Sequence, residues 1–261
     1  MTEQESVPPQ FRRTAMMIGK SGIEKLRKST VLIAGMGAVG SFATESLARA
    51  GVGTFRLVDF DIIQPSNINR QLFAHWGTLG EKKTEAARRR VLDINPNAIV
   101  ETRDILLNEQ TIPQLFQEHW ASPPDLALDA IDSLGPKVSL LAALLEHHIP
   151  VISSMGAALR TDPTQIRSGR LTEVTHCPLS AQLRKRIRRL GVNTDDISCI
   201  FSTEPVRADL KTQPERIIPP DRENERPQGN GRLRNTLGSL PTITGIFGLF
   251  LANEAILRLL S

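Results

Sequence analysis

The sequence has few of the residues that build metal centres and disulfide scaffolds. Its 261 residues include only two cysteines, Cys177 and Cys199, and no Cys-x-x-Cys pair. The five histidines show no spacing that would complete a set of metal ligands, so we expect no zinc. A disulfide between the two cysteines is not expected in a reducing compartment.

Aromatic residues are scarce as well. They make up 4% of the chain, and tyrosine is absent. Proteins that hold single-stranded nucleic acid usually stack bases on aromatic side chains. Any contact with RNA in this protein would therefore rely on Arg and Lys bound to phosphate. The net charge of +4 permits such an anionic partner without requiring one.

The chain also lacks a long apolar run that is free of charges. Its most apolar stretch, residues 240–260, contains Asn253, Glu254 and Arg258, so we expect a helix docked on the protein rather than one that crosses a bilayer. Residues 1–13 have no apolar segment of the kind found in secretory signals. These features predict a folded cytoplasmic protein with no membrane partner.

Strand and helix patterns alternate along the first 156 residues. An amphipathic segment at residues 11–28 comes first. Apolar, β-rich runs follow at residues 29–35, 54–61, 98–104, 125–132 and 149–156, separated by helical patterns at residues 38–51, 80–96, 111–120 and 133–148. This alternation predicts an α/β fold, with a Rossmann-like, mainly parallel sheet and helices on both faces.

Gly35, Gly37 and Gly40 form a G-x-G-x-x-G pattern between the first predicted strand and the next helix. In this setting the first glycine permits a tight turn, the second lets the backbone approach a phosphate, and the third allows close helix–strand packing. Asp59 follows at about 20 residues, where a carboxylate accepts hydrogen bonds from ribose hydroxyls. The pattern indicates a nucleotide and leaves NAD and ATP both open.

We predict one domain over residues 1–261. Its nucleotide-binding core covers residues 28–156, and a C-terminal part with a basic helix and extra strands covers residues 157–204. Residues 205–235 are rich in Pro, Arg and Glu and poor in apolar residues, which predicts a flexible crossover loop. A closing helix covers residues 236–261.

Four polar residues separate the two nucleotide classes. Asn67 and Arg70 follow the second predicted strand, Lys83 begins the next helix, and Asp132 ends the fourth strand pattern. Ligands of open α/β sheets bind at the carboxyl ends of the strands. A nicotinamide enzyme does not need cations over a third phosphate. An enzyme that attacks ATP at its α-phosphate uses such cations, together with a carboxylate that holds Mg²⁺. The four residues therefore favour ATP.

Each of these residues also has an ordinary structural role to weigh. Asn67 and Arg70 could cap the segment after the strand, and Lys83 could lie beside Lys82 on a solvated helix face. Asp132 could be a helix N-cap. Their joint occurrence in this order favours the functional interpretation.

The motifs as a set resemble a known superfamily. "GMGAVG", "LVDFDIIQPSNINRQ", "LGEKK", "LDAID" and "DPTQI" are similar, in order and spacing, to the adenylating core of the ubiquitin-activating superfamily, in its ThiF, MoeB and HesA branch. "FRRTAMMIG", "SSMGAALRTDPTQI", "ISCIFSTE" and "GSLPTITGIFGLFLAN" most resemble the tRNA threonylcarbamoyladenosine dehydratases of that branch. The resemblance runs from about Phe11 to the C-terminus and is weak only across residues 206–235.

The resemblance implies ATP and Mg²⁺ as ligands and assigns a role to each motif residue. The three glycines approach the phosphates, Asp59 holds the ribose, and Asp132 supports the metal and the reacting phosphate. The triphosphate is contacted by Asn67, Arg70 and Lys83. The resemblance also implies a homodimer in which an N-terminal arginine reaches the partner's site. Arg13 is our candidate, with Arg12 next to it.

The implied reaction is adenylation of the carboxylate of threonylcarbamoyladenosine in a tRNA anticodon loop, followed by cyclisation to an oxazolone with release of AMP and pyrophosphate. The main alternative is an adenylyltransferase that activates the C-terminal glycine of a ubiquitin-like sulfur-carrier protein. The lack of zinc thiolates disfavours it. An NAD-dependent oxidoreductase and a non-catalytic nucleotide-binding scaffold are further alternatives. A monovalent cation and a sulfur-transfer accessory protein stay open.

Two further features each have a structural and a functional interpretation. Cys199 lies in an apolar, strand-like run, which favours a small buried side chain over an acyl-accepting thiol. A basic run on a predicted helix is either a solvated face or a docking site for tRNA phosphates. Its members are Arg184, Lys185, Arg186, Arg188 and Arg189.

Overall fold

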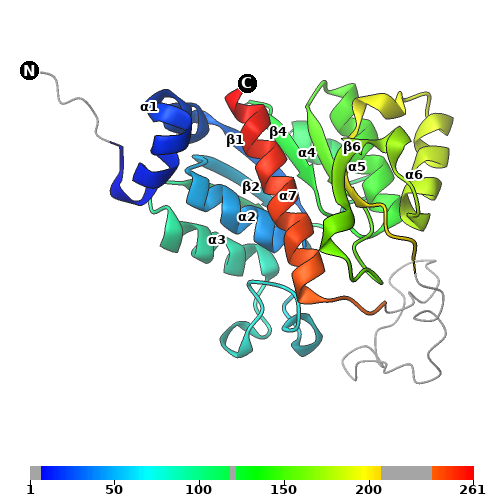
Figure 1. The fold of residues 1–261 in the computed structure, drawn as a ribbon, viewed down its shortest axis with the longest axis horizontal. Helices are drawn as coiled ribbons and strands as arrows, with labels where there is room; N and C mark the ends of the chain where they lie inside the picture. Colours follow the sequence, from blue (N-terminus) through cyan, green and yellow to red (C-terminus); the bar gives the residue numbers. More distant parts are fainter. Residues whose placement is uncertain (1–6, 118–121, 207–236) are drawn as a thin grey trace, which may run out of the picture.

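The computed structural model of the chain describes residues 7–117, 122–206 and 237–261 (Figure 1). Its strands form one sheet in the order β3-β2-β1-β4-β5-β7-β6. The strands are β1 (Thr30–Ala34), β2 (Thr54–Val58), β3 (Ile99–Arg103), β4 (Leu126–Asp129), β5 (Val151–Ser154), β6 (Ile166–Arg170) and β7 (Ser198–Ser202). All neighbours are parallel except β6 and β7. The predicted α/β class with a mainly parallel sheet is confirmed. Most of the predicted crossover loop lies outside the described residues.

Helices cover both faces of this sheet. They are α1 (Arg12–Lys28), α2 (Gly40–Ala50), α3 (Lys83–Ile94), α4 (Ile112–Gln117), α5 (Leu134–Glu146), α6 (Pro178–Arg189) and α7 (Pro241–Leu260). The apolar side chains divide into two cores that follow the alternation of the strands. In β1, Val31 and Ile33 face the core shared with α1, α2, α3 and α7, whereas Leu32 and Ala34 face α4, α5 and α6.

The closing helix α7 runs across one face of the sheet and packs along α2 (Figure 1). It is long and apolar enough to cross a membrane, but the buried core helices of globular proteins can have the same length and composition. Its Ile243, Phe247 and Leu251 are buried in the first core. Burying three large apolar side chains contributes roughly 1.5–3 kcal/mol each. The predicted docked helix is therefore what the structure contains.

Strand β6 has no counterpart in the sequence patterns. Of its five residues only Ile166 is buried, because β6 is an edge strand with β7 as its sole neighbour in the described sheet. Its antiparallel direction lets the chain return from the carboxyl edge of the sheet to the amino edge. An edge strand with one apolar residue has no hydrophobic periodicity by which to predict it.

The sheet order places the sequence motifs at one edge. Strand β1 is flanked by β2 on one side and β4 on the other. The strands up to β3 are therefore added on one side of β1 and the later strands on the other, although β1 and β4 are parallel. In open α/β sheets this switch point, at the carboxyl ends of the strands, is where a ligand crevice forms. The glycine turn follows β1, and the predicted site residues follow β2 and β4.

Candidate active site

The glycine turn packs directly against the loop that follows β4. Gly35 has a φ of +94°, which favours glycine, and a Cβ there would lie 2.9 Å from the carbonyl oxygen of Ala130. A Cβ on Gly40 would lie 1.7 Å from the carbonyl oxygen of Gly35. By contrast, the nearest atom to a Cβ on Gly37 would be Nε2 of Gln71 at 3.9 Å. The turn is therefore closed on its inner side and leaves room at Gly37, as the predicted phosphate approach requires.

Asp59 lies just past β2 and is tied to the same turn. Its Oδ2 accepts a hydrogen bond of 2.6 Å from the backbone N–H of Met36, and its Oδ1 accepts one of 2.9 Å from the N–H of Asp61. Burial raises the pKa of this carboxyl, and the nearby Lys83 charge and the two backbone N–H groups only partly oppose that effect. Each carboxylate oxygen has a second lone pair, so Asp59 can still accept a ribose hydroxyl.

Lys83 is buried, although it begins α3 next to the exposed Lys82. Its Nζ lies 2.7 Å from Oδ2 of Asp61. Lys82 turns outward and pairs with Asp104. The solvated-face alternative thus describes Lys82 and is wrong for Lys83. The sequence prediction missed Asp61, whose carboxylate compensates the charge of the buried lysine. The only sequence signal for it was that it is the second aspartate of "DFD".

Asn67 and Arg70 lie in the segment that joins β2 to α3 and have structural contacts there. Oδ1 of Asn67 accepts a hydrogen bond from the N–H of Gln64, which caps a short 3₁₀ turn, Pro65–Asn67. Nη1 of Arg70 donates to the carbonyl oxygen of Ser66 at 2.9 Å. These capping contacts hold the segment in shape, so the structural alternative is present, and the expected role in binding stays a prediction.

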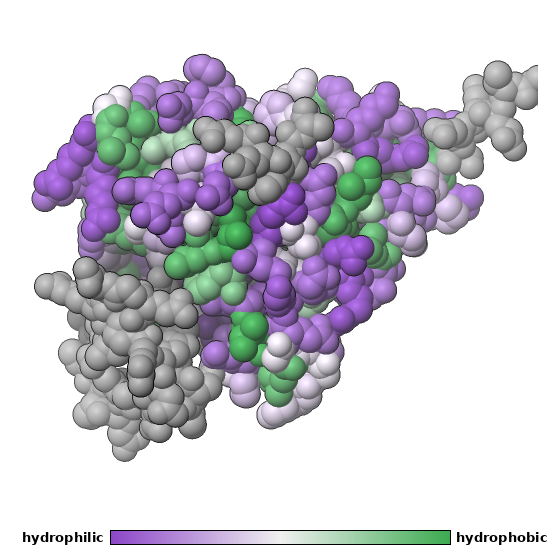
Figure 2. Space-filling view, turned by 180° about the vertical axis from the view of Figure 1, so that it is seen from behind, coloured by the Kyte–Doolittle hydropathy of each residue, from purple (hydrophilic) through white to green (hydrophobic). Residues whose placement is uncertain are grey.

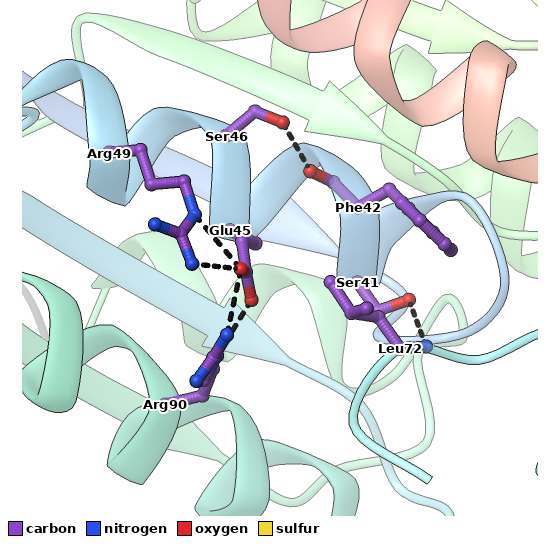
Figure 3. A network of polar contacts seen from close by, with 7 residues as sticks. All are labelled: Ser41, Phe42, Glu45, Ser46, Arg49, Leu72 and Arg90. Atoms are coloured by element: carbon purple, nitrogen blue, oxygen red, sulfur yellow. Dashed lines mark hydrogen bonds and ion pairs between the residues drawn. The ribbon is translucent and has the colours of Figure 1, made fainter.

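The segment is also fastened to α2. The N–H of Leu72 donates to Oγ of Ser41, in the first turn of that helix, at 3.1 Å (Figure 3). Residues from the turn, the β2 loop and the start of α3 are therefore held together at one edge of the sheet. We find here the predicted neighbourhood of the glycines, Asp59, Asn67, Arg70 and Lys83.

Asp132 is exposed in the loop after β4, which ends at Asp129 and not at Asp132. Its Oδ1 accepts a hydrogen bond from Oγ of Ser133 at 3.1 Å. The N-cap residue of α5 is Ser133, so the N-cap alternative for Asp132 is wrong. Among the described residues no group of three or more His, Cys, Asp or Glu could hold a metal ion.

A buried ion pair lies beneath the Asp132 loop. Nζ of Lys137 is 2.5 Å from Oδ2 of Asp129, and neither side chain is exposed. The lysine also donates to Oγ of Ser153 and to the carbonyl oxygen of Ser154 at the end of β5. Oδ1 of Asp129 accepts the N–H of Ile131 at 3.1 Å. This network joins β4, β5 and α5 and fixes the start of the loop; a lysine inside a helical pattern gave no sequence signal for it.

A second network closes the other half of the same edge. Arg160, after β5, is buried and donates from Nη2 to the carbonyl oxygen of His176. Its Nε and Nη1 have no hydrogen-bond partner within the described part of the chain. Burial lowers the pKa of this guanidinium, against the opposing influence of Cys177 and Glu204. Glu204, after β7, accepts hydrogen bonds from the N–H groups of Thr161 and Asp162.

Two other predicted residues lie away from this edge. Phe11 packs on Gly51 at the end of α2, so the exposed Arg13 starts about 16 Å, the length of that 11-residue helix, from the glycine turn. Cys199 is fully buried in β7, and burial raises the pKa of its thiol.

The basic helix was predicted correctly as an element, but its first cation has another role. Nη1 of Arg184 donates to the carbonyl oxygens of Leu171 and Val174, so this guanidinium is turned inward. The remaining four cations are exposed.

The sheet order and the glycine turn at its switch point define a doubly wound nucleotide-binding protein, and the buried Lys83 beside the turn suits a phosphate ligand. More specifically, the chain belongs to the ThiF family, whose model matches residues 11–261.

Relatives of known name cover most of the chain. It is 38% identical over 207 residues to a tRNA threonylcarbamoyladenosine dehydratase of Bacillus subtilis, covering 78% of this chain and 80% of the relative. It is 32% identical over 266 residues to that of Haemophilus influenzae, covering 100% and 97%. The crystal structure of the Escherichia coli enzyme in complex with ATP superposes with a TM-score of 0.81 at 28% identity, covering 96% and 93%.

Proposed function

We propose that this protein is an ATP-dependent dehydratase. It adenylates the carboxylate of threonylcarbamoyladenosine in a tRNA anticodon loop and closes it to the oxazolone, with release of AMP and pyrophosphate. The observation that carries the proposal is the edge where the glycine turn, Asp59 and the buried Lys83 meet in a chain whose full-length relatives are such dehydratases.

ATP binds with its phosphates over the glycine turn and the amino end of α2, where free N–H groups and the helix dipole attract anions. Asp59 holds the ribose. Arg70 and Lys83 stabilise negative charge that develops on the phosphoryl oxygens. When the triphosphate displaces Asp61 from Lys83, the lysine exchanges one anionic partner for another and stays compensated.

The protein side chains at this edge fit a Mg²⁺ ion that takes most of its ligands from the ATP phosphates. Mg²⁺ is commonly bound by one or two carboxylates together with substrate phosphates and water, and Asp132 offers one exposed carboxylate at this edge. Bound there, the ion would neutralise charge on the phosphates.

The chemistry needs two displacements. A carboxylate oxygen of the threonyl group attacks the α-phosphorus, the bond to the bridging oxygen breaks, and pyrophosphate leaves. The carbamoyl oxygen then attacks the activated acyl carbon. The bond between this carbon and the phosphate oxygen breaks, AMP leaves, and the threonyl nitrogen loses its proton. Because the second attack is intramolecular and forms a five-membered ring, it gains from proximity and does not require a protein thiol.

The test is conversion of purified threonylcarbamoyl-modified tRNA with ATP, with nucleosides measured by mass spectrometry. The wild type should yield the cyclic nucleoside, AMP and pyrophosphate. Lys83→Ala should lower kcat/KM by roughly 10²-fold or more. Lys82→Ala, at the exposed neighbouring lysine, is the matched control and should change little.

The sulfur-carrier alternative shares the adenylation step, so the same assay separates the two functions. ATP–pyrophosphate exchange that depends on a carrier protein ending in glycine, without conversion of the tRNA, would sink the dehydratase proposal. Wild-type activity in Lys83→Ala would sink the assignment of the site.

We further propose a homodimer in which Arg13 completes the partner's site. Arg13 starts a helix length from its own glycine turn, so it cannot serve that turn within one subunit. Large apolar side chains are exposed on α1 and α7, which contact one another. They are Met16, Met17, Leu249, Phe250 and Leu257. Covering them with a second copy removes apolar surface from water.

A further inference from the structure

One face of α6 consists of exposed cations that have no carboxylate partner among the described residues. The helix buries Leu183 and Ile187 in the core beside α5 and exposes its basic residues on the other side. These exposed residues are Lys185, Arg186, Arg188 and Arg189, here called the α6 basic face. Within the described ranges none of the four forms an ion pair with a carboxylate.

The arginine run of α3 provides a contrast within the same molecule. Arg88, Arg89 and Arg90 are consecutive, and each has a carboxylate partner. Arg90 shares Glu45 of α2 with Arg49, at N–O distances of 2.6–2.9 Å (Figure 3). The α6 basic face has a similar density of cations, and within the described residues it has no such acids. An anionic partner can supply the neutralising charge that the described residues do not.

The unpaired arrangement has a cost in the free protein. Lys185 and Arg189 are four residues apart and lie one above the other, as do Arg186 and Arg189 at three. Like charges at this spacing destabilise a helix by about 0.2–0.5 kcal/mol per pair. Only those in the last turn gain from the helix dipole. The acids of the next turn, Asp195 and Asp196, are exposed and do not pair with the face.

Helix α6, which carries this face, starts at the same edge of the sheet as the candidate active site. The amino end of α6 is at the carboxyl edge of the sheet, because the preceding His176 accepts the hydrogen bond of Arg160. From there the 12 residues run for about 18 Å along the side of the molecule. Seen from behind, hydrophilic side chains project from the left side of the molecule, where α6 lies in this view (Figure 2).

We propose that the α6 basic face docks the phosphate backbone of the tRNA while the modified anticodon nucleotide lies at the carboxyl edge. This inference rests on the proposed function. It assigns four cations and leaves out Arg184, whose guanidinium is already bound by backbone carbonyls. Contacts to successive phosphates carry no base information, so the face supplies affinity and orientation while the site selects the nucleotide.

The experiment compares the wild type with a variant in which all four cations are replaced by glutamine. The affinity for threonylcarbamoyl-modified tRNA is measured from about 50 to 200 mM salt. The variant should bind at least roughly tenfold more weakly at low salt, and its log–log salt slope should fall by about 3, since each phosphate contact contributes about 0.7–0.9. Its affinity for ATP and its melting temperature should stay at wild-type values.

The matched control replaces Arg88, Arg89 and Arg90 of α3, which the inference excludes from docking. That variant should keep the wild-type tRNA affinity and salt slope. A variant of α6 with wild-type affinity and slope would overturn the inference while leaving the dehydratase proposal intact.

The opposite failure is also visible. Should the wild type bind tRNA through this face without converting it, the docking surface stands and the proposed reaction falls. Should the wild type bind no tRNA, both fall.

Discussion

Adjacent residues of like type have different environments in this protein, and the environment decides what each does. Lys82 is exposed and paired with Asp104, whereas Lys83 is buried and paired with Asp61 at the edge where the nucleotide is expected. Burying a lysine costs free energy because its ammonium group loses its hydration, so a buried lysine is found where an anion can pair with it. The same reasoning separates the inward Arg184 from the exposed Lys185 beside it.

The thiol inventory allows a prediction about mechanism. Cys199 is fully buried in β7, and burial raises the pKa of its thiol, so little thiolate is present at neutral pH. Cys199→Ala should therefore keep tRNA conversion within about threefold of the wild type. Kinetics with modified tRNA measure this directly.

The reactivity of the Cys199 thiol can also be measured directly, by alkylation with iodoacetamide and detection by mass spectrometry. Native protein should leave Cys199 unmodified, while urea-unfolded protein should react at both cysteines. Loss of conversion in a Cys199→Ala variant with an unchanged melting temperature would instead establish a thioester route.

At this scale the sequence predicts best where a motif imposes a backbone geometry or a charge. The glycines and Asp59 are where the pattern places them, because the turn permits few alternatives. Asp61 and Asp129 went unpredicted, since their roles depend on partners brought by other elements. Which of two adjacent lysines is buried likewise depends on tertiary packing.

Among the elements, the carboxyl edge is held by loops fastened to one another rather than by the strands alone. Glu204 fastens the end of β7 to the loop after β5 by accepting N–H hydrogen bonds from Thr161 and Asp162. Burial by itself would raise the pKa of this carboxyl. The backbone N–H groups, the Thr161 hydroxyl and the Arg160 charge outweigh burial and hold the pKa below its ordinary value.

This lowered pKa has a definite consequence for stability. A carboxyl with a lowered folded-state pKa stabilises the fold above its ordinary value, 4.5, and loses that contribution as the pH falls through the folded-state value. Glu204→Gln should lower the free energy of unfolding by about 1–3 kcal/mol at pH 7, and by less at pH 4. Urea unfolding at the two pH values measures the difference.

The control is Glu146→Gln, at an exposed carboxyl, which should shift stability by no more than about 0.5 kcal/mol at either pH. If Glu204→Gln lowered the free energy of unfolding more at pH 4 than at pH 7, the ionised carboxylate would not be the form of Glu204 that stabilises the fold.

Elements were predictable in proportion to their hydrophobic periodicity. Buried parallel strands and amphipathic helices carry it, so β1, α2 and α7 were found close to their bounds. β6 lacks it. The ends of β2 and β4 were predicted too long, because the polar residues that follow a strand also suit the strand pattern until a loop hydrogen bond ends it.

For the whole molecule, the proposed role of Arg13 in the partner's site predicts that activity requires the dimer. Arg13→Ala and Lys83→Ala homodimers should each be inactive. Co-expressed, they form mixed dimers in which one site has both residues. Statistical pairing then restores about a quarter of the wild-type conversion.

Arg12→Ala is the matched control and should stay active alone. If co-expression restores nothing, or if Arg13→Ala is fully active, the partner contribution of Arg13 is wrong.

The buried pair of Lys137 and Asp129 has a consequence for how this sequence can change over time. Removing one partner leaves an uncompensated buried charge, at a cost of about 3–5 kcal/mol. That is a large share of the roughly 5–15 kcal/mol that stabilises a domain. Neither residue can therefore drift alone. The two positions can be exchanged only together, so variation among descendants of this chain should be coupled at these two sites and free at the surface around them.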